Sequence, residues 1–101
     1  MTQLTIYDIA SLLLQFYPGM GACGWHSSSS DYIFAISAHA WSGGNKCGKS
    51  ARICHGSKCV TAKLVDECPG CSSGSLDLSP AAFKKLASLS TGQVNIKWHF
   101  T

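Results

Sequence analysis

Six cysteines in 101 residues constrain this chain more than any other feature. A domain of this size buries a limited core, and disulfides commonly stabilise such domains in oxidising compartments. Cytosolic thiols are kept reduced, so this cysteine density favours an extracellular location. We therefore expect a single secreted domain that is crosslinked by disulfides.

Charge and hydropathy narrow the function classes. Eight Lys+Arg and five Asp+Glu give a formal charge of +3, far below the dense basic patches of nucleic-acid-binding domains. No apolar run reaches the roughly 20 residues that span a bilayer. The run 9–16 has about the length of a signal-peptide core, but the first Lys or Arg is Lys46. We expect no nucleic-acid partner, no membrane partner and no evident signal peptide in this chain.

Short strands dominate the expected secondary structure. Apolar runs predict strands at 12–17 and 32–36, and alternation predicts a last strand at 94–100. Two further strand-like runs, 49–54 and 59–66, flank a four-residue turn and predict a hairpin. One helix is expected to begin at Ser79-Pro80 and to end near Gly92, because Ser caps helices and Pro suits their first position. This pattern favours a β-rich barrel or an α+β domain.

The spacing of the cysteines supports one disulfide and leaves alternatives open. Cys54 and Cys59 flank the predicted hairpin turn, so their side chains would lie close across two strands. A zinc site made by this pair with Cys68 and Cys71 is a weaker alternative, because the two pairs are closer in sequence than in zinc ribbons. A redox role for Cys68 and Cys71 is weaker still, since serines and a glycine follow where a helix would be needed.

Three of the five acids stand apart from the basic residues. Asp66, Glu67 and Asp77 fall in the stretch 64–83, which contains no Lys or Arg, and Asp66 and Asp77 are the candidate site residues. Such carboxylates beside glycine-rich turns are candidates for acid chemistry on a sugar or for binding hydroxyls. They also suit the ordinary role of Asp in loops, which is to accept backbone N–H groups, and residue types alone favour this second reading.

Several motifs occur in a characteristic order: Gly21-Ala22-Cys23-Gly24-Trp25, Cys47-Gly48-Lys49, Val65-Asp66-Glu67-Cys68-Pro69-Gly70-Cys71, Leu76-Asp77-Leu78-Ser79-Pro80-Ala81-Ala82-Phe83 and Val94-Asn95-Ile96-Lys97-Trp98. The set resembles the double-psi β-barrel superfamily: the first domain of expansins, barwin, kiwellins, rare lipoprotein A-like domains and small fungal expansin-like proteins. The resemblance implies a mainly β fold, a six-stranded double-psi β-barrel with one or two short helices. It covers residues 12–101 and leaves 1–11 as an extension outside the barrel.

The resemblance also implies crosslinks and site residues. The implied disulfides are Cys23–Cys47, Cys54–Cys59 and Cys68–Cys71. Asp77 falls at an acidic position of expansins that serves as the general acid in family 45 endoglucanases, and Asp66 matches a second acid of the expansin groove. Trp25 falls where expansins carry an aromatic residue, and Tyr17 and Trp41 are further candidates for contacts with sugar rings.

Two departures from the family bear on activity. The first strand of active expansins carries a threonine and that of the hydrolases an aspartate, whereas the corresponding stretch here is read as Leu13-Leu14-Gln15-Phe16-Tyr17. The second, carbohydrate-binding domain of expansins has no counterpart in this sequence. A hydrolytic base is therefore not expected, because an inverting mechanism needs a second carboxylate.

These features predict a monomeric, extracellular protein that binds cell-wall polysaccharide without hydrolysis. Cellulose, chitin and peptidoglycan are the candidate polymers, and no metal or cofactor is expected. One alternative is a protein-binding inhibitor or effector, of the papain-like protease inhibitor or kiwellin type. Another is an activity like that of a lytic transglycosylase, in which one acid can suffice.

Overall fold

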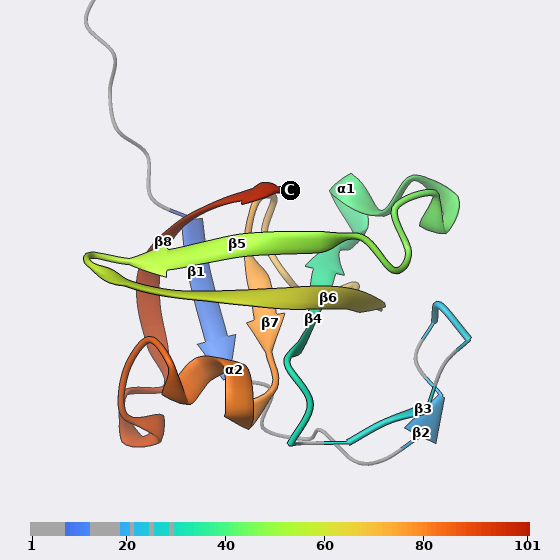
Figure 1. The fold of residues 1–101 in the computed structure, drawn as a ribbon. Helices are drawn as coiled ribbons and strands as arrows, with labels where there is room; N and C mark the ends of the chain where they lie inside the picture. Colours follow the sequence, from blue (N-terminus) through green and yellow to red (C-terminus); the bar gives the residue numbers. More distant parts are fainter. Residues whose placement is uncertain (1–7, 13–18, 21, 25, 29) are drawn as a thin grey trace, which may run out of the picture.

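A closed six-stranded barrel forms the body of the molecule (Figure 1). The computed structural model describes residues 8–12, 19, 20, 22–24, 26–28 and 30–101. In order around the barrel, the strands are β1 (Asp8–Leu12), β7 (Leu76–Leu78), β4 (Ile33–Ser37), β6 (Lys58–Cys68), β5 (Ser50–His55) and β8 (Gln93–Phe100). The mainly β, six-stranded fold that the resemblance implies is confirmed.

Two of the six strand pairs are parallel and join strands that are far apart in the sequence. β1 runs parallel to β7, and β4 runs parallel to β6, whereas the other pairs are antiparallel. The short helix α1 (Ala38–Trp41) follows the end of β4, and α2 (Pro80–Lys84) follows the end of β7. Figure 1 shows the two helices at opposite ends of β4, with the β5–β6 hairpin crossing between them.

The remaining elements are short. Strands β2 (Gly19–Met20) and β3 (His26–Ser27) pair with each other in a separate antiparallel sheet. Two 3₁₀ helices, η1 (Ser42–Gly44) and η2 (Leu89–Thr91), follow α1 and the α2 segment. No helix among the described residues is long and apolar enough to cross a membrane.

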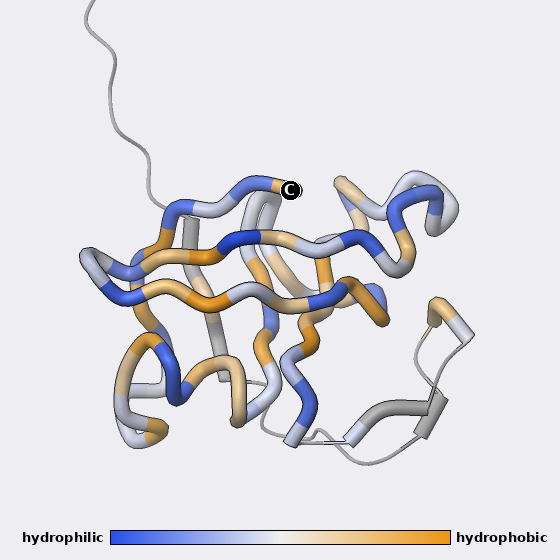
Figure 2. Tube along the Cα trace, viewed as in Figure 1, coloured by the Kyte–Doolittle hydropathy of each residue, from blue (hydrophilic) through white to orange (hydrophobic). Residues whose placement is uncertain are grey.

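The barrel interior is filled by alternate residues of its strands. Along β8, Val94 and Ile96 are buried while their neighbours Gln93, Asn95 and Lys97 are exposed, which is the period-2 pattern of a half-buried strand. Figure 2 shows the corresponding alternation of apolar and polar segments along the β5–β6 hairpin and β8. Phe83 and Leu86, from α2 and the turn after it, are fully buried and pack into the same core.

The first strand lies earlier in the sequence than we predicted. We expected a strand at 12–17 and a barrel that begins at residue 12, but β1 starts at Asp8, so residues 8–11 belong to the barrel. Ala10 is completely buried in the core, and this small residue gave little apolar signal beside the run that follows. Residues 13–17 of the expected strand lie outside the described residues.

The other predicted elements are found with adjusted ends. The hairpin is confirmed, with Cys54 paired to Cys59 in the β5–β6 register. The helix is shorter than expected, because α2 ends at Lys84 and Ser88 caps a separate 3₁₀ turn. Its predicted start is confirmed, since Ser79 Oγ accepts a hydrogen bond from the Ala82 N–H.

Candidate functional site

Strand register brings the two candidate carboxylates onto one face of the barrel. Ala35 of β4 pairs with Asp66 of β6 on one side and with Asp77 of β7 on the other. The row continues to Ser11 of β1, which pairs with Asp77, and to Gln93 of β8, which pairs with Ser11. Directly paired residues share a face, so these five positions form one line across five strands, which we call the acidic row.

A β-bulge puts Asp66 into this row. The β4–β6 register shifts between Phe34 and Ala35, so that Phe34 pairs with Leu64 and Ala35 skips Val65 to pair with Asp66. Without the extra residue, Val65 would occupy the position of Asp66. Bulges commonly re-aim a side chain in this way. Because neighbouring strands lie about 4.8 Å apart, the backbones at Asp66 and Asp77 are roughly 10 Å apart.

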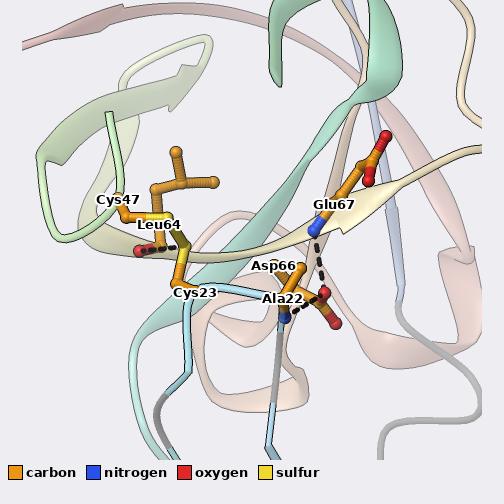
Figure 3. The surroundings of a disulfide bond; sticks show 6 residues. All are labelled: Ala22, Cys23, Cys47, Leu64, Asp66 and Glu67. Atoms are coloured by element: carbon orange, nitrogen blue, oxygen red, sulfur yellow. Dashed lines mark hydrogen bonds between the residues drawn. A yellow bond between two sulfur atoms is a disulfide. The ribbon is translucent and has the colours of Figure 1, made fainter. Parts of the chain in front are cut away.

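Asp66 holds the 22–24 loop against β6. Its Oδ1 accepts the backbone N–H of Ala22 and that of Glu67, each at 2.8 Å (Figure 3). The N–H of Cys23 also donates to the Val65 carbonyl at 3.1 Å, and the Cys23–Cys47 disulfide ties the loop to the turn before β5. Asp66 therefore has the loop-bonding role that residue types alone favoured.

Asp77 has a different environment. It lies between the fully buried Leu76 and Leu78 but points to the outer face, where it is half-buried. Burial raises the pKa of its carboxyl above the ordinary value, because desolvation penalises the charged form. Its Oδ2 lies 3.1 Å from Cys68 Sγ. That sulfur carries no proton, since it belongs to the Cys68–Cys71 disulfide, so a hydrogen bond here requires the protonated Asp77 to donate.

A hollow of about 460 Å³ opens in front of Asp77. Its lining includes hydroxyl, carboxyl and amide groups and consists of Cys68, Gly70, Cys71, Ser72, Ser75, Asp77 and Gln93. Hydroxyl and amide groups can both donate and accept hydrogen bonds, and a protonated carboxyl adds a donor. The arrangement suits a ligand with many hydroxyls, and it places one acid where a proton can be given.

The cysteines form the three disulfides that the resemblance implies: Cys23–Cys47, Cys54–Cys59 and Cys68–Cys71. The ligand atoms of Cys68, Cys71 and Asp77 all lie within 4.8 Å of one another, a spacing that a metal ion could bridge. Zinc binds cysteine as the thiolate, and in a disulfide neither sulfur is one. The chemistry of these sulfurs therefore disfavours the zinc site that used both cysteine pairs.

One of the three aromatic candidates lies among the described residues. Trp25 and Tyr17 lie outside the described residues. Trp41 in α1 is half-buried and packs against the core, and a Cβ on Gly44 would come within 3.2 Å of its ring. Trp98 is half-buried against Phe34 and Phe100, and its Nε1–H donates to the Gly74 carbonyl at 2.9 Å.

Sequence reasoning missed several polar residues at this site. Ser11 was overlooked because the strand was expected to begin after it, although its register beside Asp77 makes it the polar β1 position. Gln93 could have been found by extending the alternation of β8 one residue back. Ser37, two residues beyond Ala35 on β4, is fully buried and its hydroxyl has no hydrogen-bond partner among the described residues.

Comparison with known proteins agrees with this geometry. The model of a double-psi β-barrel family, described as lytic transglycolase, matches residues 17–98. The chain belongs to this double-psi β-barrel family. Over 90 residues the barrel is 39% identical to a papain inhibitor of Streptomyces mobaraensis, a match that covers 81% of this chain and 63% of that protein.

Two solved double-psi β-barrel structures are similar along almost the whole chain. The Streptomyces papain inhibitor superposes with a TM-score of 0.83 at 31% identity, covering 95% of this chain and 93% of that one. A mutant Clavibacter michiganensis expansin in complex with cellohexaose superposes with a TM-score of 0.82 at 25% identity. The expansin match covers 94% of this chain and 49% of that one, so the barrel spans about half the length of the expansin and less than two thirds of the curated papain inhibitor.

Proposed function

We propose that this chain is a secreted protein that binds cell-wall polysaccharide along the acidic row and does not hydrolyse it. The observation that carries the proposal is the register that sets Asp66 and Asp77 on one face, with the small Ala35 between them. A sugar chain laid across this row would meet the two carboxylates on a floor with no bulky side chain at its centre. A bound cellohexaose in the expansin named above is consistent with this class of ligand.

The lack of hydrolysis follows from the groups in the row. Inverting hydrolysis needs an acid and a carboxylate base on opposite faces of the sugar. Asp77, with its raised pKa, suits the acid, whereas Asp66 already accepts two backbone N–H groups through Oδ1. The β1 position beside Asp77 is Ser11, and a neutral hydroxyl is a poor general base.

Retention on insoluble cellulose, chitin and peptidoglycan tests this proposal. We expect the wild type to be retained on at least one polymer and Asp77→Asn to bind it about tenfold more weakly. Asp31→Asn is the matched control, because it makes the same change of charge on an acid outside the row. Equal retention of both variants would contradict the proposed site, and reducing ends released in an Asp77-dependent manner would contradict the absence of hydrolysis.

A second candidate function is inhibition of a papain-like cysteine protease. The identity of 39% to a papain inhibitor, and the similarity to a solved Streptomyces papain inhibitor over 93% of its length, favour it. Papain activity on a fluorogenic peptide, titrated with the full chain, tests this candidate. Inhibition without retention on any polymer would replace the first function by the second, and retention without inhibition would remove the second.

A further inference from the structure

A separate hollow lies beside α2, where β4 begins. It measures about 630 Å³ and is lined by Ser30, Tyr32, Pro80, Ala81, Lys84, Lys85 and Leu89. An adjoining hollow of about 450 Å³ shares Lys84 and Leu89 with it and adds Lys58 from the hairpin. We call this combined surface the α2 face. None of these residues lines the hollow at Asp77.

The α2 face gathers the exposed apolar side chains. Among the described residues, the large hydrophobic side chains that are exposed are Tyr32 (45%) and Leu89 (37%), and both line this hollow. Pro80 and Ala81 add further apolar surface between them. Single exposed hydrophobic residues are ordinary, but two that converge on one concave surface are typical of a protein interaction site.

Hydrogen bonds through one buried serine hold the parts of this face together. Ser79, which is completely buried, donates from Oγ to the Asp31 carbonyl at 2.6 Å, and its N–H donates to the Ile33 carbonyl at 3.0 Å. The Tyr32 carbonyl, between these two, accepts the Lys63 N–H at 3.0 Å. Tyr32 and the start of α2 therefore keep a fixed relation, and a partner would meet a surface that is already formed.

The charged side chains of the α2 face are all basic. Lys84 and Lys85 line the larger hollow, and Lys58 lines its neighbour. Lys85 Nζ lies 5.7 Å from the centre of the Tyr32 ring, so a cation sits directly beside the exposed aromatic. No described lining residue of either hollow is acidic. The complementary partner surface carries carboxylates.

We infer that the α2 face binds an acidic polypeptide segment that presents one apolar side chain between its carboxylates. The apolar side chain would lie between Tyr32 and Leu89, and the carboxylates would meet the three lysines. A polypeptide fits better than a glycan, because the exposed apolar side chains of Tyr32 and Leu89 converge here beside three lysines, and a peptide can offer both an apolar side chain and carboxylates.

Binding of two synthetic peptides by the full chain tests this inference. The first peptide has one central leucine flanked on each side by four glutamates, and the second has glycine in place of the leucine. We expect amide shifts in an NMR titration to cluster on the α2 face, and the glycine peptide to bind at least fivefold more weakly. Lys84→Glu should weaken binding at least tenfold, and Tyr32→Ala, which leaves the charge unchanged, at least fivefold.

Lys49→Glu is the matched control, because it makes the same charge change on an exposed lysine that lines neither hollow of the α2 face. If Lys49→Glu and Lys84→Glu weaken peptide binding equally, the loss comes from the net charge of the protein and not from the α2 face, and the inference is overturned. Equal affinity for the two peptides would also overturn it, because no apolar anchor would then be recognised. Polygalacturonate, an acidic glycan, serves as a third probe: stronger binding of it through the same residues would assign the face to a glycan instead.

Discussion

The acidic row and the α2 face lie on the same barrel but differ in chemistry and in how they are held. The row has two carboxylates, a hollow whose lining includes two serines and a glutamine, and two neighbouring disulfides, Cys23–Cys47 and Cys68–Cys71. The α2 face has two exposed apolar side chains and three lysines, and it rests on a fully buried Phe83 and on the hydrogen bonds of Ser79.

The difference shows how a small domain can support a polar surface. A hollow lined by hydroxyls and a half-buried acid contributes little hydrophobic stabilisation, since that scales with the apolar area removed from water. Covalent crosslinks beside the row constrain its loops without any need for apolar packing. The Cys54–Cys59 disulfide beside Lys58 closes only the hairpin turn, and no disulfide among the described residues joins α2 to the barrel. The α2 end therefore depends on packing, so the two regions should respond differently to substitution.

The largest loss of stability is expected at the α2 end. Phe83→Ala removes a fully buried aromatic side chain from the core and should lower the free energy of unfolding by about 3–5 kcal/mol. Urea unfolding measures the change, with the exposed neighbour Lys84→Ala as a control that stays within about 0.5 kcal/mol of the wild type. A loss below about 1 kcal/mol for Phe83→Ala would mean that this end does not depend on packing.

The next largest effect is expected from the long crosslink of the acidic row. Replacing Cys23 and Cys47 together by Ala opens a link between residues 24 positions apart, and in the chain-entropy model this should lower stability by about 3.5 kcal/mol. The same replacement of Cys68 and Cys71, only 3 positions apart, should lower it by about 2 kcal/mol. Denaturant unfolding of both double variants gives the ranking, and the reverse order would contradict the entropic account.

A smaller effect is expected for the serine that joins α2 to β4. Ser79→Ala removes the helix cap and the bond to the Asp31 carbonyl, so it should cost about 1–2 kcal/mol. Ser88, which caps η2 from an exposed position, is the control. Thermal unfolding should show a clearly smaller drop in melting temperature for Ser88→Ala than for Ser79→Ala. Equal drops would mean that the buried position of Ser79 adds nothing to an ordinary helix cap.

The smallest effect concerns Asp77 and depends on pH. Its pKa is raised in the folded state, so the folded protein holds the proton more tightly than the unfolded chain. Below the pKa that Asp77 has in the unfolded chain, the raised pKa costs the folded protein no stability. As the pH rises through the pKa of Asp77 in the folded state, the wild type becomes less stable, because the half-buried carboxyl must then carry a charge. Asp77→Asn should therefore melt at the same temperature as the wild type near pH 3 and slightly higher near pH 7. A melting temperature that falls at pH 7 would mean that the carboxylate stabilises the fold.

Sequence patterns predicted those parts of the fold that local contacts determine. The β5–β6 hairpin, the cap at Ser79 and the alternation of β8 all follow from residues close in the chain. The strand β7 has three residues and lies between a polar turn and the start of α2, so it gave no periodic signal. The start of β1 was missed for a related reason, because its pairing with β7 and β8 decides where it lies.

The candidate site likewise has features that the sequence predicts and features that only long-range strand pairing produces. Asp66 and Asp77 stood out because the stretch 64–83 around them contains no Lys or Arg, and the motif order gave their family positions. Their common face could not be predicted, because it depends on the bulge at Val65 and on the two pairings of Ala35. The fixed contacts of Asp66, and the contact of Asp77 with a disulfide sulfur, likewise arise only in the folded chain.

The place of β1 between β7 and β8 has a consequence for the order of assembly. Ribosomes deliver the first strand long before its two neighbours, which are the last strands of the barrel to be made. The β5–β6 hairpin, with Cys54 and Cys59 adjacent, can form and oxidise while β1 still has no partner. Closure of the barrel must then wait for the final residues of β8. Until then both edges of β1 have unpaired backbone groups, which can pair with another chain.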